Sequence, residues 1–121
     1  MFDDHQENRF RDMKVERKET VRIKTLDWFL EQNRISRVDL LKSDTQGYDL
    51  RVLAGASESL RRGLINNVLV ELNFVRMYAG QSEPDDILNF LAQHGLFLVD
   101  YYEKVRQSQT LAWCTALFTK R

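Results

Sequence analysis

The first regular pattern along the chain is an alternation of apolar and polar residues between positions 19 and 26. Val21 and Ile23 fall on one face of this segment, whereas Arg22 and Lys24 fall on the other. A period of two residues is typical of a half-buried β-strand. The alternation therefore predicts a strand at residues 19–26.

Four further apolar runs are short enough to be strands. Residues 38–44 and 67–74 are nearly continuous apolar runs that end in polar residues, which is typical of central strands buried on both faces. Residues 97–103 and 111–120 are joined by a short polar segment, so we predict an antiparallel pair.

Helix signals fall between these runs. Thr25 is a suitable N-cap for a helix that follows the first strand, and residues 48–63 carry leucines at helical spacing that Gly55 divides into two parts. A third helix is predicted to begin after Ser82, where a capping hydroxyl precedes Pro84 and several acids.

Strands that alternate with helices predict an α/β fold with a mostly parallel sheet and an antiparallel C-terminal strand. We divide the chain into a polar lead-in, residues 1–18, and one domain, residues 19–121. In open parallel sheets the ligand lies beyond the carboxyl ends of the strands. Polar residues of this chain are expected at that edge, namely Asp44, Gln46, Glu71 and Asn73.

Composition narrows the possible partners. Lys plus Arg and Asp plus Glu each number 18, so no net charge attracts nucleic acid or an anionic membrane. No apolar run approaches the roughly 20 residues that cross a bilayer. The single cysteine, Cys114, has no disulfide partner within the chain, and no secretion signal is recognisable. We therefore expect a cytoplasmic protein that binds neither nucleic acid nor membrane.

Several motifs in register give the chain a family resemblance. Residues 25–27 read TLD, residues 42–49 read KSDTQGYD at the end of an apolar run, residues 52–56 read VLAGA, and a second apolar run ends at Glu71. This series resembles the FkbM family of methyltransferases, clearly over residues 20–75 and more loosely beyond. Gln46 and Asp49 stand where that family often has glutamates.

The resemblance implies a class I, Rossmann-like methyltransferase fold that uses S-adenosylmethionine (SAM) as its cofactor and methylates a hydroxyl group of a sugar, polyketide or similar metabolite. Such enzymes hold the cofactor with a glycine-rich loop after their first strand and an acid after their second. No such pair precedes Glu19. We therefore expect a partial sheet that lacks its first strands, and the residues that bind the cofactor stay unassigned.

Methyl transfer needs an oriented acceptor and, for a hydroxyl, a base. We assign the catalytic roles to Asp44 and Glu71, and expect no metal because no histidines cluster near them. The alternatives are that Asp44 caps the next helix and that Glu71 is paired with Lys42. Four residues are assigned to substrate binding, namely Lys42, Gln46, Asn73 and Tyr78.

Two other functions remain open. A truncated or split methyltransferase would act as a non-catalytic interaction or assembly module, either as a homo-oligomer or paired with a missing N-terminal half through its exposed sheet edge. The second open function is metal-dependent phosphoryl transfer, because folds with that activity also carry an aspartate at the end of a strand, as Asp44 is here.

Overall fold

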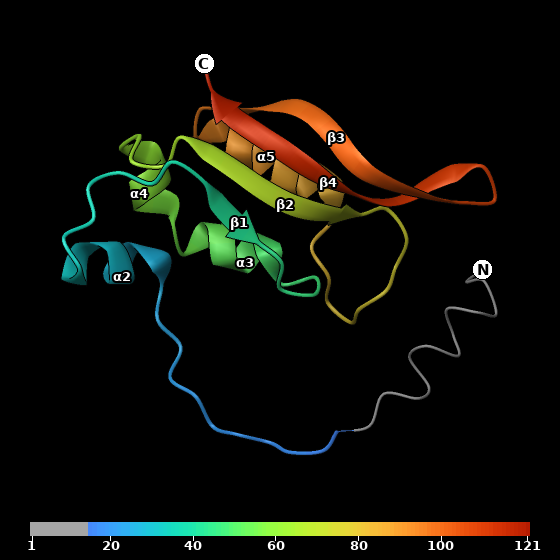
Figure 1. The fold of residues 1–121 in the computed structure, drawn as a ribbon, viewed down its shortest axis with the longest axis horizontal. Helices are drawn as coiled ribbons and strands as arrows, with labels where there is room; N and C mark the ends of the chain where they lie inside the picture. Colours follow the sequence, from blue (N-terminus) through green and yellow to red (C-terminus); the bar gives the residue numbers. More distant parts are fainter. Residues whose placement is uncertain (1–14) are drawn as a thin grey trace.

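We analysed a computed structural model of the chain, which describes residues 15–121. Four strands form one sheet in the order β1-β2-β4-β3 (Figure 1). Their bounds are Leu41–Ser43 for β1, Asn67–Asn73 for β2, Leu96–Gln107 for β3 and Thr110–Lys120 for β4. The helices are α2 at Leu26–Gln32, α3 at Asp49–Ala54, α4 at Ser57–Arg61 and α5 at Pro84–Gln93.

Strand directions match the prediction from the sequence. β1 is parallel to β2, while β4 is antiparallel to both of its neighbours, β2 and β3. The strands β1, β2 and β3 therefore run in one direction, and the C-terminal strand β4 runs against them. Together with the helices between the strands, this is a mixed α/β fold.

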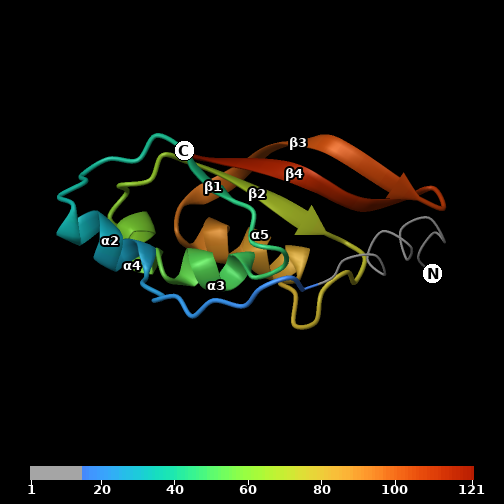
Figure 2. The ribbon, with the colours of Figure 1, turned by 60° about the horizontal axis from the view of Figure 1, so that its bottom comes forward.

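The helices lie on one face of this sheet, as Figure 2 shows for α3, α4 and α5. Side chains along β2 and β4 alternate between fully and partly buried. The buried set packs with the helices around Leu53, Ile87 and Leu91. We call the other side, which carries Glu71 and Thr115, the open face, because no helix of residues 15–121 covers it.

The predicted strand at residues 19–26 is wrong. Residues 15–25 form neither helix nor strand, and Val21 and Ile23 are 71% and 83% exposed. A strand needs a neighbour for its backbone hydrogen bonds and for its apolar face. β1 lies at the edge of the sheet, and residues 19–26 do not pair with it. Of the predicted lead-in, residues 1–14 lie outside the described residues.

The helix predictions are largely confirmed. Thr25 caps α2, since its Oγ1 accepts a hydrogen bond from the Trp28 amide at 3.1 Å. Gly55 separates α3 from α4. Pro84 opens α5, but Ser82 is not its cap: Glu83 holds the N-cap position without a side-chain bond. The Ser82 hydroxyl instead accepts a hydrogen bond from the Leu50 amide in the first turn of α3 and donates one to the Gly47 carbonyl.

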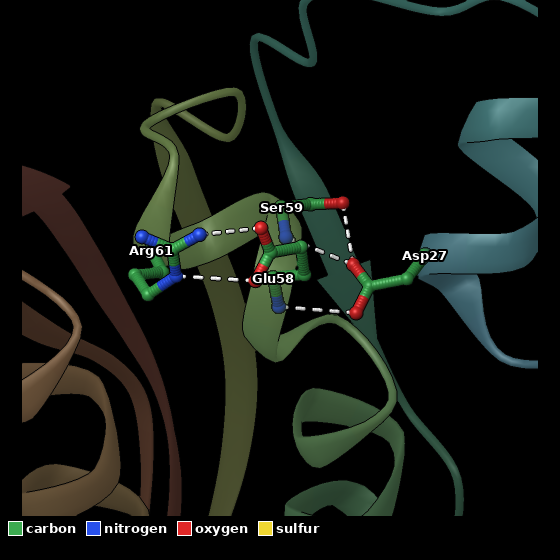
Figure 3. Close-up of polar contacts among 4 residues, drawn as sticks. All are labelled: Asp27, Glu58, Ser59 and Arg61. Atoms are coloured by element: carbon green, nitrogen blue, oxygen red, sulfur yellow. Dashed lines mark hydrogen bonds and ion pairs between the residues drawn. The ribbon is translucent and has the colours of Figure 1, made fainter.

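Asp27 links α2 to α4, a role that its position in the first turn of α2 did not reveal. Its carboxylate accepts hydrogen bonds from the Glu58 amide (3.0 Å), the Ser59 amide (2.9 Å) and the Ser59 hydroxyl (2.5 Å) (Figure 3). The carboxylate thereby satisfies two free N–H groups in the first turn of α4. The same residue donates its own amide to the Gly55 carbonyl. The TLD segment and the VLAGA helix are therefore one packed unit.

We expect Asp27→Ala to lower the free energy of unfolding by about 2 kcal/mol and the Tm by about 10 °C, since three donors lose a charged acceptor. Thermal unfolding followed by circular dichroism measures the change. Glu31→Ala is the matched control, because Glu31 is an exposed acid on the same helix. An Asp27→Ala protein that melts with the control would show that this link contributes nothing to stability.

Candidate active site

The carboxyl ends of the two parallel strands bring the predicted acids together. Ser43 is aligned with Val70, so Asp44 and Glu71 follow at the next position and share the open face. Both line a small pocket of about 80 Å³. Its lining residues come from all four strands or the positions next to them and are Lys42, Ser43, Asp44, Leu69, Val70, Glu71, Glu103 and Thr115.

Glu71 is in an electrostatic environment that favours its protonated form. Partial burial, reinforced by the negative charges of Asp44, Asp49 and Glu103, raises the pKa of the Glu71 carboxyl above its usual value of 4.5. A hydrogen bond from Asn73 acts in the opposite direction. A carboxyl group with a raised pKa beside a second carboxylate is a common arrangement for acid–base chemistry.

Neither structural alternative for these two acids is found. In the first turn of α3 the Leu50 amide donates to the Ser82 hydroxyl at 2.9 Å and not to Asp44, so Asp44 does not cap that helix. Within residues 15–121 the ion pairs lie elsewhere, and Lys42 lines the pocket without pairing with Glu71. Asp44 and Glu71 are thus available to a ligand.

The acid that organises the turn after β1 is Asp49. It is 2% exposed, and its Oδ1 accepts hydrogen bonds from the Ser43 hydroxyl (2.5 Å), the Thr45 hydroxyl (2.9 Å) and the Thr45 amide (3.2 Å). These contacts hold the backbone on both sides of Asp44. The sequence placed Asp49 in a motif without giving it a role. The available signal was an acid two residues after a turn glycine.

A second loop, between β2 and α5, closes on that turn. Gly47 has a φ of +90°, and a Cβ there would lie 2.9 Å from the Gln81 side chain. The Ser82 amide and hydroxyl both donate to the Gly47 carbonyl, at 2.7 and 3.0 Å. Gln81 in turn accepts hydrogen bonds from the Met77 and Tyr78 amides. The two loops at this end of the sheet therefore form one unit.

Two predicted substrate-binding residues belong to this unit and not to the pocket lining. The Tyr78 hydroxyl donates a hydrogen bond to the Gln46 side-chain carbonyl. Burial, followed by the charges of Glu71, Asp44 and Asp49, raises the pKa of Tyr78 above 10.0. The pair joins the loops at the margin of the site.

Asn73 lies on the same strand face as Glu71, two residues further along β2, and does not line the pocket. It is 3% exposed, and its Oδ1 has no hydrogen-bond partner among the described residues. Buried acceptors are nearly always paired with protein or water. The donor for this oxygen therefore comes from water or from outside the described residues.

Glu103 and Thr115 line the pocket but were not predicted. They come from β3 and β4, which reach the site only because β4 pairs with β2 and brings Thr115 opposite Glu71. Nothing in the local sequence of these strands distinguishes the two residues from the other polar strand positions.

A larger cavity of about 360 Å³ lies away from these acids, between α2, α4 and the segments that follow them. Two of its acids are already engaged: Asp27 by the first turn of α4, and Glu58 by Arg61 at 2.5 Å (Figure 3). Ligands of open parallel sheets bind instead beyond the carboxyl ends of the strands. We therefore place the candidate site at the smaller pocket.

Residues 15–121 do not by themselves fit SAM. The turn with left-handed residues after β1, Gln46 and Gly47, is covered by Tyr78 and Gln81, so its backbone offers no open cradle. No cluster of at least three His, Cys, Asp or Glu side chains in this part of the chain is arranged to hold a metal ion.

An α/β sheet with acids gathered at the carboxyl ends of its parallel strands belongs to a broad class of ligand-binding and group-transfer domains. The chain belongs to the FkbM methyltransferase family, because the model of the methyltransferase FkbM domain matches residues 2–97. Searches of curated proteins and of solved structures gave no match. No helix of residues 15–121 has both the length and the apolar character needed to cross a membrane.

Proposed function

We propose that this chain is the acceptor side of a SAM-dependent O-methyltransferase whose acceptor is a hydroxyl group of a sugar, polyketide or similar small metabolite. The observation that carries the proposal is the pairing of Asp44 and Glu71 in one pocket at the carboxyl ends of parallel strands, within a chain of the FkbM family. Elements outside residues 15–121, in the same protein or a partner, would hold the methyl donor.

In this proposal the two carboxylates have different tasks. Glu71 takes the proton that the hydroxyl loses when its oxygen is methylated, because partial burial and the neighbouring negative charges raise the pKa of its carboxyl group. Asp44, more exposed and next to the rigid turn, accepts a hydrogen bond from the acceptor and orients it. Lys42 contributes the one positive charge in the lining of this pocket.

The division between donor and acceptor halves is tested by calorimetry. We expect residues 1–121 to show no micromolar affinity for SAM, while the protein as its natural host makes it transfers labelled methyl groups from SAM to hydroxyl compounds. Micromolar binding by the isolated chain would overturn the proposed division. Absence of methyl transfer by the natural protein across polyols, sugars and polyketides would overturn the enzymatic function itself.

A second candidate is a non-catalytic assembly module, which acts as a homo-oligomer or with a separate N-terminal half. It is favoured by the edge position of β1 and by the unpaired, exposed Val21 and Ile23. An unpaired strand edge is a ready site for adding another strand. Sedimentation distinguishes the candidates, since a monomer with dispersed NMR signals argues against pairing through this edge.

A further inference from the structure

Strand β3 contains an irregularity beside the candidate site. Tyr102 is aligned with Thr115 and Val105 with Trp113, so Glu103 and Lys104 together lie opposite the single residue Cys114. This is a β-bulge, and Glu103 has a φ of +49° within it. Glycine is the usual residue at a bulge position with left-handed backbone. A glutamate there is held against its own conformational preference.

The bulge changes the direction of the Glu103 side chain. Regular alternation after Tyr102, which is aligned with Thr115 on the open face, would direct the next side chain to the helix-covered side. Instead the Glu103 carboxylate accepts a hydrogen bond from the Thr115 hydroxyl at 3.1 Å and lines the pocket of Asp44 and Glu71. Bulges near active sites often re-aim a side chain in this way.

The pocket therefore has three carboxylates and one ammonium group, that of Lys42, in its lining. The carboxylates do not gather around one point as the ligands of a metal ion would. A volume of about 80 Å³ equals that of two or three water molecules, which is enough for one functional group and its neighbour. An ammonium group with three donors matches several separated carboxylates better than a hydroxyl with one donor.

Resting on the acceptor site proposed above, we propose that Glu103 is a specificity-determining residue that selects acceptors with a protonated amine next to the hydroxyl. The substrate class is then the hydroxylated amines, such as amino alcohols and amino sugars. Asp44 and Glu71 act on the hydroxyl, and Glu103 binds the ammonium group. Glu103 and Glu71 line the same pocket, and the negative charge of Glu103 is one of those that raise the pKa of Glu71.

Two small probes that differ in one group test the preference. 2-Amino-1,3-propanediol and glycerol have the same heavy-atom skeleton, and their dissociation constants are measured by NMR titration of the labelled chain at pH 7. We expect roughly tenfold tighter binding of the amine by the wild type and no more than about twofold by Glu103→Gln. Glu31→Gln, which removes an equal charge on α2, should keep the wild-type ratio.

A second variant separates specificity from a purely structural role of the bulge. Glu103→Gly suits the left-handed backbone, so we expect it to raise the Tm while abolishing the amine preference. The proposal is overturned if the wild type binds neither probe, if it does not prefer the amine, or if both Glu103 variants retain the preference.

The failure of this proposal is distinguishable from failure of the proposed function. Amine preference that depends on Glu103, in a natural protein that transfers no methyl groups, overturns the methyltransferase function and leaves the binding role intact. Methyl transfer with equal kcat/KM for amine-bearing and neutral hydroxyl acceptors overturns the role of Glu103 and leaves the proposed function intact.

Discussion

Replacing Glu71 by glutamine is expected to lower kcat by about 10²- to 10⁴-fold, the usual contribution of a general base. The amide keeps the shape of the side chain but cannot take a proton. The assay is methyl transfer from SAM by the protein as its host assembles it. A Glu71→Gln protein with wild-type kcat would exclude Glu71 as the base.

The pH dependence gives a second signature of the same residue. A base acts only when deprotonated, so activity should fall as the pH drops through the raised pKa of Glu71, and the acidic limb should lie above 4.5. Asp44→Asn removes a negative charge that raises this pKa. We expect that variant to shift the acidic limb of the pH–activity profile to lower pH. An unchanged limb would show that the limb does not report the ionisation of Glu71.

Thermal unfolding of the Glu71→Gln protein shows whether the variant has lost catalysis alone or has also lost its fold. The pKa of Glu71 is higher in the folded than in the unfolded chain, so its favourable contribution is complete below the unfolded value near 4.5 and is lost as the pH rises through the folded value. At neutral pH, Glu71→Gln should therefore unfold at the same temperature as the wild type or slightly above it. A drop in Tm would contradict this electrostatic account.

Asp49→Ala is expected to have the largest effect on stability, lowering the free energy of unfolding by about 3 kcal/mol and the Tm by about 15 °C. The physical reason is that the Ser43 hydroxyl and the two Thr45 donors lose a buried, charged acceptor. Urea and thermal unfolding measure the loss.

The control for this prediction is Asp86→Ala, which removes an exposed acid from the first turn of α5. Because Asp49 fixes the backbone around Asp44, its loss should also weaken binding of 2-amino-1,3-propanediol and shift the amide NMR signals of residues 42–47. Equal melting of the two alanine variants would show that the Asp49 contacts are dispensable.

The sequence alone determined those elements whose signals all lie within one short segment of the chain. The break at Gly55, the first turn of α5 at Pro84 and the antiparallel pair β3–β4 needed only local geometry and a short connection. The family resemblance likewise followed from motifs in register, and the match to residues 2–97 bears it out. Asp44 and Glu71 were placed together because parallel strands end at one edge of a sheet.

Only the tertiary structure decided the contacts between segments far apart in the sequence. The alternation at residues 19–26 did not produce a strand, because a strand forms only when a neighbour accepts its hydrogen bonds. Ser82 serves the turn after β1 and Asp27 serves α4, since a polar side chain bonds whichever free backbone group packing brings within reach. Glu103 entered the site through a bulge and a strand order that no local pattern encodes.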